Sequence, residues 1–168
     1  MDRKSKTVAL GGIFGALNLL TLFGAAYVQT NTLFFYGASS LFVSFVIVEA
    51  GIGAGWLFYG ATTLLAFLLL PDKPAVLPYA VFFGLYGLVK YYTESLKRPV
   101  PEYILKGAFL ALAAAALYLL YTRLFARVIV SVIPLQYLIL PAILVFYIYD
   151  YLYTRFLSFY IHKFVRKA

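Results

Sequence analysis

The chain has 168 residues, of which 64% are hydrophobic and only 12% are charged. A soluble domain is roughly half apolar and a quarter charged, and one of this length could not cover so much apolar surface. The composition excludes an ordinary water-soluble domain and predicts a single domain, residues 1–168, surrounded by membrane lipid.

Charge and cysteine content exclude further classes of protein. The net charge is +8, but the lysines and arginines occur in short blocks beside apolar runs, as in membrane proteins, and not on a face with stacking aromatics. The chain has no cysteine and a single histidine, His162, which excludes disulfides and multi-histidine metal sites. We therefore expect no metal, no cofactor and no nucleic-acid partner. The lack of a P-loop or a nucleophile motif argues against an enzyme.

Apolar runs long enough to cross a bilayer, about 20 residues each, predict six helices. Their approximate ranges are 7–28, 33–49, 52–70, 75–94, 102–125 and 135–162. The first run is too long for the apolar region of a signal peptide, so we expect it to be retained. The second and third helices share one apolar stretch, and small residues after Glu49 predict a tight turn between them. The expected fold is an all-α, six-helix membrane bundle.

The distribution of positive charge predicts the orientation of this bundle. With both ends on one side, eleven of the fourteen lysines and arginines lie on that side, and only Lys73, Arg123 and Arg127 lie on the other. Cytoplasmic loops carry the excess of positive charge. We therefore expect both termini in the cytoplasm and a multi-pass protein of the bacterial cytoplasmic (inner) membrane.

A set of charged residues falls at one depth, near the cytoplasmic leaflet, and we call it the inner charge belt. Its members are Glu49, Lys90, Glu94, Glu102, Lys106, Asp150 and Arg155. Two pairs of opposite sign are spaced i,i+4, the favourable spacing on a helix. Ionisable residues at this depth are costly unless paired, which makes them functional candidates. They predict a self-neutralising network that locks helix ends, a contact surface for a cytoplasmic partner, or a proton-linked site.

Polar residues at the opposite side form a second candidate set, which we call the outer polar set. Its members are Asn18, Thr21, Gln29, Asn31, Asp72, Gln136 and Tyr137. Asn18 and Thr21 lie about one turn apart inside the first helix and should face the bundle interior. The set predicts either a binding pocket open to the outside or ordinary loop polarity with one interhelical hydrogen bond.

Small residues and aromatic residues suggest two more features. Gly11 and Gly15 are spaced G-x-x-x-G in the first helix, and Gly12 and Ala16 repeat this spacing, which permits close helix packing inside the protein or with a partner helix. The chain also has 16 tyrosines, 16 phenylalanines and one tryptophan. Such density is typical of rings at the membrane interface, and the alternative is a stacking pocket for a flat-ring ligand.

Four segments carry a resemblance to a known family: 6–12 (KTVALGG), 46–53 (VIVEAGIG), 82–94 (FFGLYGLVKYYTE) and 102–106 (EYILK). They resemble small bacterial membrane proteins related to the substrate-binding (S) components of energy-coupling factor (ECF) vitamin transporters. The resemblance implies a small-molecule site near the outer face. It also implies that Gly12 and Ala16, together with Gly11 and Gly15, dock a transmembrane coupling subunit, while separate ATPases supply energy.

Two functional hypotheses follow from these features. The first is a transport subunit that binds a small, vitamin-like molecule outside and depends on coupling and ATPase partners. The second is a non-transporting membrane scaffold or assembly factor, for which the inner charge belt would be the contact surface.

Overall fold

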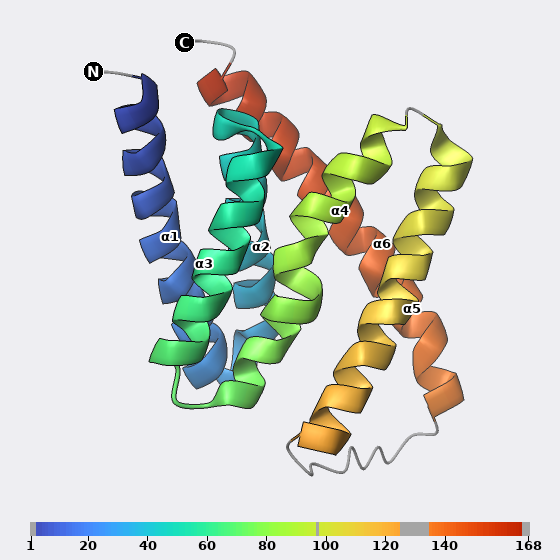
Figure 1. The fold of residues 1–168 in the computed structure, drawn as a ribbon. Coiled ribbons are helices and arrows are strands. Elements are labelled where there is room, and N and C mark those ends of the chain that lie inside the picture. The colour runs from blue at the N-terminus through green and yellow to red at the C-terminus, as the bar shows by residue number, and fades with distance from the viewer. Residues whose placement is uncertain (1–2, 97, 125–134, 166–168) are drawn as a thin grey trace.

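The structure is a computed structural model that describes residues 3–96, 98–124 and 135–165. These residues form six α-helices (Figure 1): α1 (Arg3–Tyr27), α2 (Thr32–Ala50), α3 (Ile52–Leu69), α4 (Gly84–Ser95), α5 (Pro99–Leu124) and α6 (Leu135–Tyr160). Short 3-10 turns, Gln29–Asn31 and Lys73–Val76, follow α1 and α3, and single π-turns, Tyr79–Phe83 and Ile161–Val165, precede α4 and follow α6. Within the described ranges no residue lies in a strand.

The helix starts reflect the positions of prolines. α5 begins at Pro99, three residues before the expected start, because proline fits the first turn of a helix, where its missing N–H costs nothing. The expected fourth helix, 75–94, is instead a 3-10 turn, a π-turn and α4 in succession. Pro74 lies in the 3-10 turn and Pro78 directly before the π-turn, and a proline lacks the donor that a continuous α-helix would need.

A one-residue turn joins α2 to α3. Gly51 has φ +87° and donates its backbone N–H to the carbonyl of Ile47 over 2.8 Å. A side chain is strained at this φ, so glycine suits the turn. The turn falls inside the run of small residues where the sequence places it, and it makes α2 and α3 antiparallel neighbours.

Five helical segments are long and apolar enough to cross a membrane, which makes the chain a multi-pass membrane protein. They are Thr7–Tyr27, Thr32–Ala50, Ile52–Leu69, Lys73–Ser95 and Pro99–Arg123. α6 has 26 residues, enough to span, but it is not among these five. Many large apolar side chains are exposed, including Leu57 at 77% and Leu112 at 71%. A soluble protein rarely exposes so much apolar surface, whereas lipid covers it without cost.

The helices alternate in direction, and α6 crosses the bundle obliquely. Figure 1 shows that α1 begins and α6 ends at the end of the bundle that also holds the α2–α3 turn and the α4–α5 connection. We call this the termini end. α1 to α4 pack together, α6 contacts α2, and α5 stands apart from α1 to α3. Hydrogen bonds of Ser40 and Ser44 with Tyr149 and Tyr153, each 2.7 Å long, join α2 to α6.

Candidate functional site

Three helices meet at a buried aspartate near the termini end. Asp150 of α6 accepts a hydrogen bond from Lys90 of α4 at Oδ1 (2.6 Å) and one from Lys106 of α5 at Oδ2 (2.9 Å). The exposed fractions of the three residues are 7%, 1% and 1%. Charges removed from water this far are tolerated only when they are paired, so this one carboxylate stabilises two buried ammonium groups.

Two glutamates complete the group, which we call the ion cluster: Lys90, Glu94, Glu102, Lys106 and Asp150. Glu94 Oε1 lies 2.6 Å from Lys90 Nζ and 3.5 Å from Lys106 Nζ, and Glu102 Oε1 lies 2.7 Å from Lys106 Nζ. Two lysines and three carboxylates leave a formal charge of −1. The glutamate side chains are only partly exposed, 38% for Glu94 and 22% for Glu102.

Two uncharged residues that the sequence reasoning missed support the ion cluster. Tyr86 donates its hydroxyl to Asp150 Oδ1 over 2.5 Å, and Thr154 accepts a hydrogen bond from Lys90 over 2.8 Å. Tyr86 is four residues before Lys90, and Thr154 is four residues after Asp150. Helix positions four apart share a face, so this spacing was the signal available in the sequence.

The inner charge belt therefore divides in the structure. Five of its residues form the ion cluster, whereas Glu49 and Arg155 lie outside it. Glu49 accepts a hydrogen bond from Tyr160 over 3.0 Å, and Arg155 is exposed and donates to Tyr151 over 2.9 Å. Arg155 is five residues from Asp150, which turns it to a different face of α6.

A cleft of about 410 Å³ opens beside the ion cluster, and we call it the ion-cluster cleft. Its lining combines the charged groups with three tyrosines: Glu94, Glu102, Tyr103, Lys106, Tyr147, Asp150, Tyr151 and Thr154. Glu94 and Glu102 contact the lysines through Oε1. The described part of the chain does not place three or more acidic or histidine groups to hold a metal ion.

The structure describes the side chains of four residues of the outer polar set, and these four do not line one pocket. Asn18 is fully buried and donates to the hydroxyl of Tyr79 over 2.7 Å, and Thr62 of α3 bonds the same hydroxyl over 2.8 Å. Thr21 donates to the carbonyl of Asn18 within α1. Asn31 and Asp72 are exposed in the connections at the opposite end from the termini. The side chains of Gln29, Gln136 and Tyr137 lie outside the described residues.

A second cleft, of about 240 Å³, lies between α2, the π-turn Tyr79–Phe83, α5 and α6, and we call it the aromatic cleft. It is lined by aromatic and aliphatic side chains: Leu33, Phe82, Phe83, Leu110, Ala142, Val145, Phe146 and Tyr149. Phe82 contacts the ring of Phe146 edge-on, with centroids 5.9 Å apart. Leu33 lies in the first turn of α2 and Phe83 precedes α4, so this cleft lies toward the end opposite the termini.

The small residues of α1 separate into two kinds. Gly12 and Ala16 are exposed on one side of α1, between Val8 and Leu20, which are 75% and 65% exposed. A Cβ added at Gly15 would instead contact the ring of Phe58 in α3, and Gly11 is half-buried. Gly15 therefore serves packing inside the bundle, whereas Gly12 and Ala16 face outward.

Comparison of the chain with models of known protein families, with curated proteins and with solved structures finds no match.

Proposed function

We propose that this chain is the small-molecule-binding subunit of a multi-component membrane transporter of the ECF type, with separate coupling and ATPase subunits. The aromatic cleft is the observation that carries the proposal. Ligand sites in helical membrane proteins lie between helices and are mostly apolar with a few polar groups. The cleft has this composition, with the Tyr149 hydroxyl as a polar group nearby.

In the proposed orientation the chain crosses a bacterial inner membrane six times, with α6 as the sixth span and both ends in the cytoplasm. The distribution of lysine and arginine, eleven against three, supports this orientation. The aromatic cleft then lies in the outer half of the bundle and the ion cluster in the inner half. A binding subunit that collects its ligand from outside needs its site in the outer half.

The proposed substrate class is a small molecule with a flat ring. Phe82, Phe83 and Phe146 present aromatic faces and edges, which favour offset-stacked or edge-on contact with a planar ring. The cleft is smaller than the usual range of about 300–1,000 Å³, so a single ring system fits better than a large cofactor. Asn18 is engaged in helix packing, and for this reason the aromatic cleft, and not the outer polar set, is the proposed contact region.

The second candidate function is a membrane scaffold that binds a partner helix, and one feature favours it. α5 presents small residues, Gly107, Ala111 and Ala114, along a cleft of about 370 Å³ beside α6. Small residues let helix backbones approach closely in lipid. A scaffold, however, needs no aromatic cleft.

Binding of small flat-ring vitamins, such as pyridoxine, to the purified full chain tests the proposal. We expect at least one to raise the melting temperature, because a ligand that binds only the folded state stabilises it. Val145→Trp should fill the aromatic cleft and weaken binding at least about tenfold, which corresponds to a loss of about 1.4 kcal/mol. The measurement is the dissociation constant by microscale thermophoresis or calorimetry.

Leu144→Trp is the matched control, because it places the same ring one residue earlier on α6, outside the lining of the aromatic cleft. It should leave the dissociation constant unchanged. If no flat-ring compound shifts the melting temperature and no coupling subunit or ATPase copurifies with the chain, the transport proposal fails and the scaffold is favoured.

A further inference from the structure

The described side chains that line the aromatic cleft carry no charge, and Tyr149 alone among them has a polar atom. The Tyr149 hydroxyl lies 2.7 Å from Ser40 Oγ, and Ser40 donates its own proton to the carbonyl of Gly37 over 2.6 Å. Tyr149 is therefore the donor to Ser40, and its single hydroxyl proton is already used. Among these lining side chains, none has a donor left for an anionic ligand.

Tyr86 separates the aromatic cleft from the ion cluster. It is fully buried, and its ring packs against those of Phe146 and Tyr149, with centroids 5.6 and 5.1 Å away. Its hydroxyl donates to Asp150 over 2.5 Å. Asp150 in turn pairs with the two lysines of the ion cluster. The charges of the ion cluster are thus used among themselves and supply no counter-ion to a ligand in the aromatic cleft.

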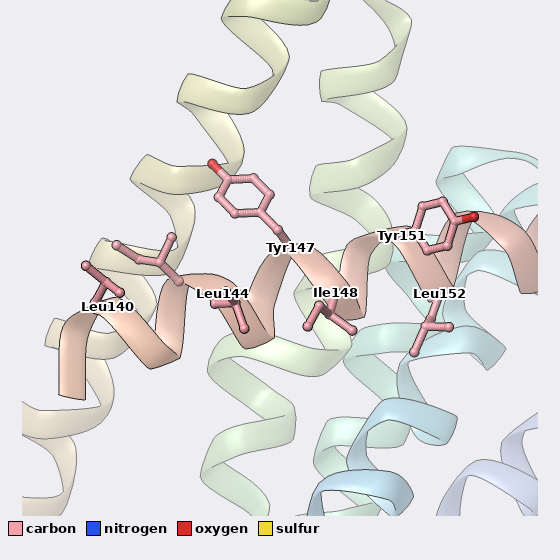
Figure 2. Close-up of a pocket in the computed structure, with 7 residues that line it drawn as sticks. Leu140, Leu144, Tyr147, Ile148, Tyr151 and Leu152 are labelled. Carbon is pink, nitrogen blue, oxygen red and sulfur yellow. The ribbon is translucent and has the colours of Figure 1, made fainter.

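The side of the aromatic cleft between α2 and α6 is open toward lipid. Leu33 of α2 and Val145 of α6 line the cleft and are 70% and 55% exposed. Next to Val145 on α6, Leu144 and Ile148 are 58% and 51% exposed, and Figure 2 shows both of them on one side of the helix. In a multi-pass membrane protein such an apolar surface contacts acyl chains, so a compound dissolved in the membrane can reach the cleft.

We propose that the aromatic cleft takes an uncharged flat-ring compound that partitions into the membrane and enters between α2 and α6. A charged compound would give up its water without receiving a counter-ion, which is costly. An apolar substituent on the ring would lie in the opening and contact lipid. This inference rests on the proposed function, because it specifies the substrate class of the same site.

Benzamide, benzoate and benzamidine test the charge preference, because they share one planar shape and are neutral, anionic and cationic at neutral pH. Their binding to the full chain in nanodiscs is measured by calorimetry, with empty nanodiscs as the blank. We expect benzoate and benzamidine to bind at least about 100-fold more weakly than benzamide, since each would bury an unpaired charge. Val145→Trp should weaken benzamide binding at least about tenfold, and Leu144→Trp should leave it unchanged.

Entry from lipid is tested with 4-butylbenzamide, which carries an apolar tail on the same ring. We expect it to bind at least about tenfold more tightly than benzamide, referred to the free aqueous concentration, because the tail leaves water for lipid. A cleft closed toward lipid would have no room for the tail. Weaker binding of 4-butylbenzamide than of benzamide would therefore overturn the proposal.

The outcomes separate this inference from the proposed function. If benzoate or benzamidine binds as tightly as benzamide, this inference fails, while a flat-ring site and the proposed function remain. If none of the four compounds binds, both fail. Equal binding of benzamide by wild type and Val145→Trp would place the compound outside the aromatic cleft and would also overturn the inference.

Discussion

Asp150 is the residue on which the packing of three helices depends. Its two carboxylate oxygens each accept from a different buried lysine, Lys90 on α4 and Lys106 on α5. Removing one partner of a buried ion pair costs more than the pair contributes, because the other charge stays buried without compensation. The aspartate should therefore matter more to stability than either glutamate of the ion cluster.

We predict that Asp150→Asn lowers the free energy of unfolding by about 3–5 kcal/mol, the range for a broken buried ion pair. Unfolding of the purified protein in detergent, followed by circular dichroism against denaturant, measures the loss. Glu102→Gln is the comparison, because the Glu102 side chain is partly exposed and Lys106 still pairs with Asp150 when Glu102 is replaced. This substitution should lower the free energy of unfolding by about 1 kcal/mol. Equal losses in the two variants would contradict a central role for Asp150.

Local spacing predicted part of this ion cluster, and tertiary packing determined the rest. The pairs Lys90–Glu94 and Glu102–Lys106 follow from i,i+4 spacing alone. That Asp150 joins both lysines depends on how α6 crosses the bundle, which periodicity does not reveal. Glu49 was grouped with the ion cluster because it falls at the same depth in the membrane. Depth does not say which face of a helix a side chain occupies, and in the structure Glu49 accepts a hydrogen bond from Tyr160 instead.

At the scale of the elements, hydropathy and the positive-charge pattern predicted where helices lie but not their internal geometry. The starts of α2 and α3, Thr32 and Ile52, fall within one residue of expectation. The segment before α4 differs, since Pro78 is followed by the π-turn Tyr79–Phe83, which contributes Phe82 and Phe83 to the aromatic cleft. An apolar run has the same composition whether it forms an α-helix or a π-helix. The sequence alone therefore could not predict which way the rings of Phe82 and Phe83 face.

The outward side of α1 gives a prediction for partner docking. Gly12→Leu should abolish copurification of a coupling subunit, because a large side chain keeps the two helices apart, while the melting temperature stays within a few degrees of wild type. Nothing lies within 4 Å of a Cβ added at Gly12, so the substitution should not disturb the bundle itself. Affinity purification of the tagged chain from its native membrane, with partners identified by mass spectrometry, measures the effect.

Gly60→Leu serves as the control for that experiment, since Gly60 is an exposed glycine of α3 with equally open surroundings. It should keep the partners. If both variants lose the partners, a large side chain on any lipid-facing helix surface would account for the loss. If Gly12→Leu keeps the partners, α1 is not part of the docking surface.

For the whole molecule, the direction of insertion can be tested without background labelling, because the chain has no cysteine. Asp72 and Arg98 are exposed and lie at opposite ends of the bundle, in the α3–α4 and α4–α5 connections. In intact cells, a membrane-impermeant maleimide should label Asp72→Cys directly and label Arg98→Cys only after permeabilisation. The reverse pattern would invert the proposed orientation and place the aromatic cleft toward the cytoplasm.

The ion cluster also has a consequence for biosynthesis. α4 and α5 each carry a neutral pair, Lys90–Glu94 and Glu102–Lys106, and can enter the membrane already compensated. α6 follows α4 and α5 in the chain and is made after them, and its Asp150 has no such partner within the helix, since Arg155 bonds Tyr151. A lone carboxylate in the membrane is costly until it meets its counter-ions. α6 can therefore reach its final position only after α4 and α5 are in place, which fixes the order in which these three helices assemble.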